Sequence, residues 1–220
     1  MLKVIDIYHQ LDIYYLAEVD GNKRQSTKGK AFMSDLYFVD CCSPTLASIK
    51  CGSLFNCCFE DRNDFINWTQ NYCKQFCRFG LRLLVLRVND HNALIYLFRI
   101  SQLRKMLCDP SNIEFLRSFG YPENCSQVYP CLQYLKKRVQ SSHVSDFPHE
   151  IGLFLGYPLK DVSGFIQNHG QNCKLLGTWK VYGDVEIARS CFTKYQKCRR
   201  VYSDLWLSGK RSILELTVPG

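Results

Sequence analysis

The sequence has no Cys-x-x-Cys pair, although it contains 13 cysteines. Zinc ribbons, zinc fingers and thioredoxin-type redox sites are built on such pairs, so these classes lose their main support. The odd number of cysteines also argues against a fully paired disulfide framework. We therefore expect reduced thiols in a cytoplasmic protein.

The sequence also lacks a long apolar run. No window approaches the roughly 20 apolar residues that a membrane span requires. The first residues, MLKVIDIYHQLDIYY, carry Asp6 and Asp12 within their apolar stretch, unlike the basic and then apolar pattern of a signal peptide. These features predict a cytoplasmic location and no membrane partner.

Signatures of common catalytic and nucleotide-binding folds are missing as well. The sequence contains no phosphate loop, dinucleotide fingerprint, nucleophile elbow or internal repeat. The net charge of +8 permits an anionic partner, but a scattered, solubilising surface would give the same total. Aromatic residues make up 14% of the chain without forming a regular basic-aromatic stripe, so no nucleic-acid platform is predicted.

What the sequence does contain is a succession of helical and extended patterns. Aromatic residues at helical spacing, followed by Gly80, predict a helix over 61–80. The apolar runs 81–88 and 93–100 flank the polar turn NDHN and predict a β-hairpin. Further predicted elements are helices at 101–107 (capped by Ser101), 112–118, 127–139 and 185–197 (capped by Asp184), and a strand at 177–184.

These elements predict an α+β fold in a single compact domain, the default at 220 residues. Its small sheet includes the hairpin near residues 81–99 and is covered by several short helices. Residues 1–38 are expected to form an N-terminal extension with a polar, basic turn over 20–30. The domain itself is expected to span 39–202, with 203–220 as a C-terminal tail.

The segment FPHEIGLFLGYP, residues 147–158, predicts a short helix. Asp146 is placed to cap it, and Gly156 lies just past its end. Glu150 then sits where the helix dipole favours an anion, and the same dipole should keep His149 neutral near pH 7. Adjacent side chains on a helix point about 100° apart, so a site that uses both must lie above the helix end.

Three interpretations of this segment remain open. His149 and Glu150 form a structural cap, or His149 is a base or metal ligand that Glu150 orients. The third is a helix-turn-helix, since a second helix follows the Gly156 turn. Its exposed positions offer one cation and one anion to phosphates, which disfavours DNA binding; they are Lys160, Asp161, Ser163, Gly164, Gln167 and Asn168.

Two groups of residues are candidates for chemistry. The first is Cys42, Lys50 and His149, because a thiolate needs a nearby cation or imidazole, and Lys50 and His149 could instead bind an anion directly. A buried Cys42 and a solvated Lys50 are the structural alternatives. The second is a weak metal site of His149, Cys173 and Cys198, with His169 or Cys191 as further ligands. The irregular spacing of these residues suits core packing equally well.

Three segments resemble an uncharacterised bacterial family, domain-of-unknown-function family 3793. They are CSPTLASIKCGSLFNC, FPHEIGLFLGYPLKDVSGFIQNHGQNCK and GTWKVYGDVEIARSCFTKYQKC. The resemblance covers roughly Asp40 to Tyr202, and the Pro-His-Glu and Leu-Gly-Tyr-Pro blocks carry it. It implies no established activity. It also implies that Lys50 fits the family pattern and that Cys42 is a better thiol candidate than Cys51.

The leading functional hypothesis is a ligand-binding or accessory protein. It would hold a small anionic metabolite or a metal-linked cofactor where the 43–50 segment meets the start of the His149 helix. The alternatives are an enzyme that uses Cys42 or His149 in catalysis and a helix-turn-helix DNA-binding regulator.

Overall fold

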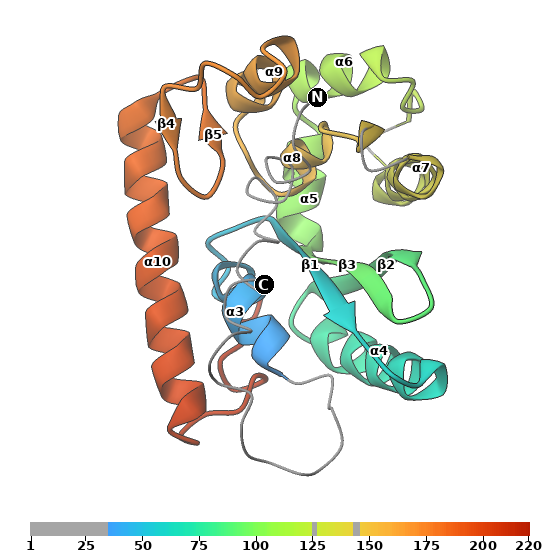
Figure 1. Cartoon of the computed structure of the whole chain (residues 1–220), viewed down its shortest axis with the longest axis vertical. Helices are drawn as coiled ribbons and strands as arrows, with labels where there is room; N and C mark the ends of the chain where they lie inside the picture. The colour runs from blue at the N-terminus through green and yellow to red at the C-terminus, as the bar shows by residue number, and fades with distance from the viewer. Residues whose placement is uncertain (1–34, 125–126, 143–145) are drawn as a thin grey trace.

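A three-stranded antiparallel sheet lies at the centre of the molecule (Figure 1). The computed structural model describes residues 35–124, 127–142 and 146–220, in which eight helices surround this sheet and a small second hairpin. The predicted α+β class in a single domain is therefore confirmed. The turn predicted over 20–30 lies outside the described residues.

The sheet has the strand order β1 (Gly52–Cys58), β3 (Asn92–Arg99), β2 (Leu81–Val88). Strands β2 and β3 form the predicted hairpin. The register of β2 against β3 shifts between Val85 and Arg87, as in a β-bulge, and the intervening Leu86 is fully buried.

Both faces of the sheet are covered, which makes the central strand β3 apolar along nearly its whole length. Alternate side chains of a strand point to opposite faces. Leu94, Tyr96 and Phe98 belong to one group of buried residues, which we call the first core cluster. Ala93, Ile95 and Leu97 belong to another, the second core cluster.

The second core cluster is closed by α3 (Leu36–Leu46) and α4 (Arg62–Cys77). Helix α4 confirms the predicted helix over 61–80. The Asp61 side chain accepts a hydrogen bond from the backbone N–H of Asp64 at its start, and Gly80 adopts a φ of 72° past its end. The C-terminal residues Ile213 and Leu216 return to this cluster.

Arg99 joins the C-terminal segment to the sheet. This side chain is fully buried, and its guanidinium donates hydrogen bonds to the carbonyl oxygens of Thr45, Leu46, Phe79 and Val218 at 2.6–3.2 Å. The first two carbonyls lie at the end of α3, where helix carbonyls lack intrahelical partners. No local sequence pattern indicated this role.

The first core cluster is built from the middle of the chain. Its elements are α5 (Ile100–Leu107), α6 (Pro110–Ser118), α7 (Val128–Ser141), α8 (Ile151–Phe154) and α9 (Leu159–Gln167), followed by the hairpin of β4 (Leu175–Leu176) and β5 (Lys180–Val181). Helix α5 begins one residue before Ser101, which therefore does not cap it as predicted.

Helix α10 (Val185–Leu207) runs down the side of the molecule past both clusters (Figure 1). Phe192 and Tyr195 belong to the first core cluster and Tyr202 to the second. The helix begins as predicted, with the Asp184 side chain accepting a hydrogen bond of 3.0 Å from the N–H of Ile187. It continues ten residues beyond the predicted end at 197, through the expected domain boundary at 202.

Candidate functional site

The Pro-His-Glu segment forms a turn and not the first turn of a longer helix. The N–H groups of Ile151 and Gly152 bond to the carbonyls of Pro148 and His149, three residues back. Helix α8 has only four residues, and Glu150 occupies its N-cap position without a side-chain capping bond. The prediction that Asp146 caps this helix is wrong, because the helix starts four residues later than its pattern indicated.

Gly156 ends α8 as predicted, with a φ of 83°. The N–H of Tyr157 bonds to the carbonyl of Gly152 at 2.9 Å, which is the long bond of a Schellman-type helix end. A Cβ atom placed on Gly156 would lie 2.9 Å from Cβ of Cys51. The segment that follows Lys50 therefore meets the C-terminal end of α8, whereas the sequence interpretation placed this meeting at the His149 end.

Glu150 is a buried structural carboxylate. Its Oε1 accepts a 2.5 Å hydrogen bond from Nε of Arg138 on α7 and a 3.2 Å bond from the hydroxyl of Tyr121. Burial and the charge of Glu150 raise the pKa of Tyr121, so this phenol stays protonated as the donor. Glu150 thus links α7 to α8, and the predicted role of orienting His149 finds no hydrogen bond to support it.

His149 lies half-buried with its imidazole edge-on to the ring of Phe165, at 4.8 Å between ring centroids. Burial lowers the pKa of His149, and the nearby charge of Glu150 opposes that shift. The direction agrees with a neutral imidazole near pH 7, although the cause is desolvation and not a helix dipole. No hydrogen bond joins a ring nitrogen of His149 to another residue within 35–124, 127–142 and 146–220, and neither nitrogen is among the fully buried, unpartnered atoms of that part.

Phe165 also contacts a cation. Nζ of Lys180 lies 5.8 Å from the centroid of the Phe165 ring and donates a 3.0 Å hydrogen bond to the carbonyl of Gly170. An imidazole and an ammonium group therefore lie against one aromatic ring. We call His149, Phe165, Gly170 and Lys180 the His149–Phe165 site.

Lys50 is buried, so the alternative of a solvated Lys50 is wrong. Its Nζ lies 5.4 Å from the ring centroid of Tyr157 and 5.9 Å from that of Tyr195, within the range of cation–π contacts. Tyr157 in turn stacks on Trp179 at 4.8 Å. Segments far apart in the sequence, including α10 and the end of α8, thus enclose this lysine.

Cys42 is fully buried in the second core cluster. Ile151, which follows the Pro-His-Glu turn, belongs to the first core cluster on the other face of the sheet. The structure therefore does not bring Cys42 and His149 together into the thiol–imidazole pair that the sequence suggested.

The metal candidates are similarly dispersed. No three His, Cys, Asp or Glu side chains of the described residues gather in a way that could hold a metal ion. Cys173 lies in the loop after α9, and Cys198 lies half-buried on α10, where burial raises its thiol pKa to about 11. No two cysteines in the described part of the chain form a disulfide.

Two of the six positions that a recognition helix would expose on α9, Asp161 and Gly164, are buried. Asp161, which the helix-turn-helix interpretation placed on the exposed side, is buried and accepts a 2.6 Å hydrogen bond from Nε1 of Trp179. Its other oxygen accepts bonds from the N–H groups of Tyr182 and Gly183 at 2.8 and 2.6 Å. Because these N–H groups bond to Asp161 and not to a neighbouring strand, the strand predicted at 177–184 shrinks to the two residues of β5.

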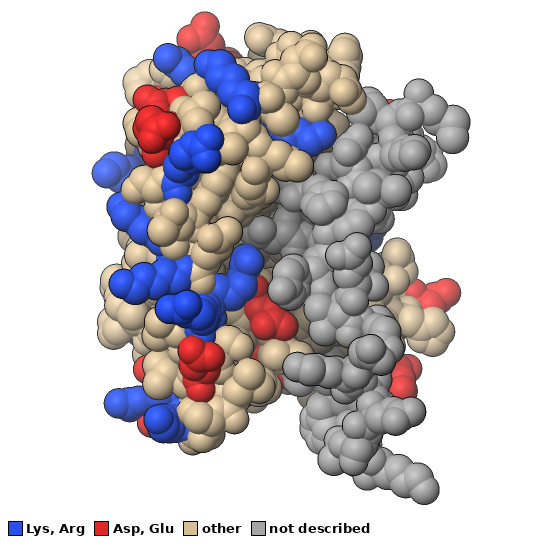
Figure 2. All heavy atoms as spheres, turned by 60° about the vertical axis from the view of Figure 1, so that its left-hand side comes forward, with Lys and Arg blue, Asp and Glu red and all other residues tan. Residues whose placement is uncertain are grey.

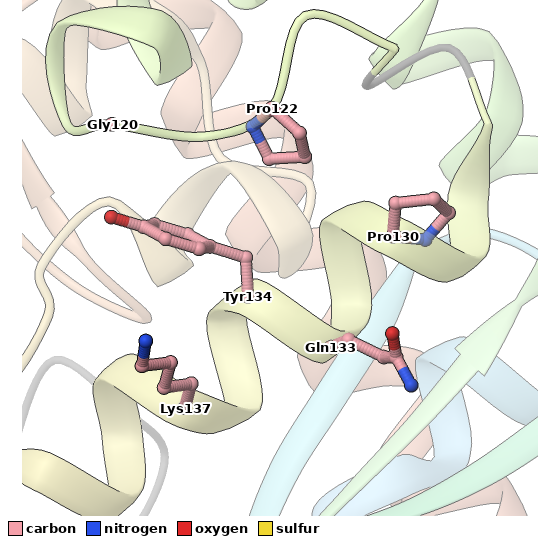
Figure 3. Close-up of a pocket in the computed structure, with 6 residues that line it drawn as sticks. All are labelled: Gly120, Pro122, Pro130, Gln133, Tyr134 and Lys137. Atoms are coloured by element: carbon pink, nitrogen blue, oxygen red, sulfur yellow. The ribbon is translucent and has the colours of Figure 1, made fainter.

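A surface groove of about 430 Å³ lies beside α7 (Figure 3). None of the sequence-predicted site residues lines it. The hydroxyl of Tyr134 at its wall donates to the carbonyl of Phe119 at 3.2 Å. The residues that line the groove are Gly120, Pro122, Pro130, Gln133, Tyr134 and Lys137.

Comparison with known proteins gives one match. A family model described as a protein of unknown function (DUF3793) matches residues 38–217, which extends beyond the resemblance seen in the sequence at Tyr202. No curated protein and no solved structure matches the chain. None of the helices that the structure describes combines the length and apolarity needed to cross a membrane.

Proposed function

Since this chain belongs to the DUF3793 family, whose function is unknown, we propose a function from its geometry. The protein is a binding or accessory protein that holds a small anion at the His149–Phe165 site. The observation that supports this proposal is His149 itself. Its imidazole is half-buried, its pKa is lowered, and its hydrogen-bonding capacity is unused within the described residues.

The electrostatics of the surroundings favour an anion. Lys180 lies with its ammonium group against the same Phe165 ring that His149 contacts. Lys180 is buried, and charges in such surroundings interact more strongly than in water. The negative charge of Glu150 is compensated by its ion pair with Arg138. The charge of Glu150 is still felt at His149, so an anion there would rely on Lys180 and on the hydrogen bond that a neutral imidazole can donate to it.

Binding is favoured over catalysis because the other reactive candidates lie in structural contacts. Cys42 is enclosed in a core cluster, Glu150 is hydrogen-bonded to Arg138 and Tyr121, and Lys50 lies between tyrosine rings. The anion is the form of ligand we propose, in preference to a metal-linked cofactor, because the His149–Phe165 site supplies only one ligand of the kind that metals prefer.

Isothermal titration with inorganic phosphate, sulfate and acetate tests the proposal. His149→Ala should weaken binding of the preferred anion by about tenfold or more, which corresponds to about 1.4 kcal/mol. His91→Ala is the matched control, because His91 is exposed in the turn between β2 and β3. It should bind like the parent protein.

Two results would overturn the proposal. One is equal anion binding by the parent and the His149→Ala variant. The other is the absence of binding of all three anions by the parent protein. A melting temperature of His149→Ala close to that of the parent would show that a lost affinity does not reflect unfolding.

A further inference from the structure

Helix α10 presents an exposed face that is strongly basic. Its inner side is buried through residues such as Ala188, Phe192 and Tyr195. Helix α10 carries five Lys or Arg residues, and its two acidic residues, Glu186 and Asp204, lie near its ends. Four of the five are exposed, and we call them the basic face of α10: Arg189, Lys194, Lys197 and Arg200.

The positive charge on this face is largely uncompensated. Figure 2 shows Lys and Arg side chains spread down the side of the molecule that α10 occupies, with fewer Asp and Glu among them. Arg189 pairs with Glu186 at 3.8 Å, but both side chains are exposed, so this pair is weak. For Lys194, Lys197 and Arg200, no ion pair is found within the described part of the chain.

Small polar side chains lie between these cations. Ser190, Thr193 and Gln196 are exposed on the same stretch of the helix. The Thr193 hydroxyl donates to the carbonyl of Arg189 at 3.0 Å, which leaves Ser190 and Gln196 as polar groups of the kind that contact phosphate oxygens beside Lys and Arg. The combination therefore fits a row of phosphates better than a single charged group.

The chemistry of the face discriminates between anionic partners. A helix that lies in a membrane surface inserts a continuous apolar side, and in α10 that side is packed in the core, which leaves only the separated Ile187, Val201 and Leu207 exposed. Single-stranded nucleic acid is held by exposed aromatic rings on which bases stack. Of the aromatic residues of α10, Phe192, Tyr195 and Tyr202 are buried, and Trp206 is partly buried against the second core cluster.

We propose that the basic face of α10 binds the phosphodiester backbone of a nucleic-acid duplex without reading its sequence. Arg189 and Arg200 are separated by 11 residues, or about 16 Å along the helix, at a rise of 1.5 Å per residue. This length matches about five phosphates of one strand at an axial spacing of 3.4 Å. The surface is distinct from α9 and from the His149–Phe165 site, and it requires neither.

Fluorescence anisotropy with labelled duplex DNA and duplex RNA of unrelated sequences tests this proposal. The variant Lys194→Glu with Lys197→Glu should weaken binding by about tenfold or more, because phosphate contacts dominate such affinity. The matched control is Lys74→Glu with Arg78→Glu on α4, which lies on the opposite margin of the molecule (Figure 1). The control changes the net charge by the same amount and should bind within about twofold of the parent.

The salt dependence and the choice of ligand complete the test. Four phosphate contacts predict a slope of log K against log salt of about −3 to −4, similar for all duplex sequences. Tighter binding of DNA or of RNA would identify the source of the duplex, and either supports the proposal. Equal losses in the α10 variant and the α4 control would overturn it, as would no duplex binding. Single strands or anionic vesicles bound as tightly as duplexes would also overturn it.

Discussion

Nε of Arg138 lies 2.5 Å from Oε1 of Glu150, and this contact joins α7 to the turn that precedes α8. The Glu150 side chain is 1% exposed, whereas that of Arg138 is 32% exposed. Water can therefore solvate Arg138 but not Glu150. Removing Arg138 leaves an unpaired carboxylate buried in the core, whereas neutralising Glu150 leaves a guanidinium that water can still reach.

Arg138→Met should lower the free energy of unfolding by about 3 kcal/mol, because an unpaired buried charge is costly. Glu150→Gln should cost only about 1 kcal/mol, since its amide oxygen can still accept a hydrogen bond from Tyr121. Urea denaturation of both variants measures the difference. A larger loss for Glu150→Gln than for Arg138→Met would contradict this assignment of the pair.

Two glycines allow backbone strain to be separated from crowding. Gly156 and Gly209 both have a positive φ, at 83° and 67°. A Cβ at Gly156 would lie 2.9 Å from Cys51, whereas nothing lies within 4 Å of one at Gly209. Gly209→Ala should therefore cost about 1 kcal/mol from strain alone, and Gly156→Ala should cost more. Equal losses of unfolding free energy in urea denaturation would show that the end of α8 can move away from Cys51 at no measurable cost.

The cysteines should differ widely in reactivity. Burial raises the thiol pKa of Cys51 and of Cys57 to about 12, so neither forms appreciable thiolate near neutral pH. Cys58, Cys77 and Cys108 are exposed. Iodoacetamide labelling of the native protein at pH 8, read by peptide mass spectrometry, should modify these three first. Early labelling of Cys51 or Cys57 would contradict their burial.

The lowered pKa of His149 makes folding stability depend on pH. The unfolded chain takes up this proton near the ordinary pKa of 6.5, and the folded protein does so only at lower pH. The contribution of His149 is therefore constant above about pH 6.5, falls as the pH drops toward the folded pKa, and levels off below it. His149→Ala should lose this dependence, and His91→Ala should retain it. Urea midpoints between pH 5 and pH 8 measure both variants, and identical profiles would refute the assignment.

Local signals in the sequence were sufficient for much of the fold. The turn between 81–88 and 93–100, the Gly156 helix end and the Asp184 cap each depend on a few adjacent residues. The partners of Glu150, Asp161 and Arg99 lie from 12 to 119 residues away, and no spacing rule encodes them. The helix start was placed wrongly at Asp146, since α8 begins at Ile151, after a turn in which Glu150 contacts Arg138 on α7.

Site residues were predicted unevenly. The Pro-His-Glu block drew attention to His149, whose half-buried position could be expected from its place beside an apolar run. The contact with Phe165 and the approach of Lys180 bring together α9, the 149–150 turn and β5. Lys180 stood in an apolar, strand-like segment, which indicated packing and gave no sign of a neighbouring imidazole.

Anion binding at His149 is tested most directly by histidine NMR, with the ring signals of the five histidines followed against pH. Without phosphate, the pKa of His149 should lie below the ordinary value of 6.5 because the imidazole is buried. With phosphate, its pKa should rise, since a bound anion stabilises the imidazolium, while the ring signals of the exposed His91 should respond little to the addition of phosphate. A His149 pKa that does not change with phosphate or with the other anions would contradict the proposed site.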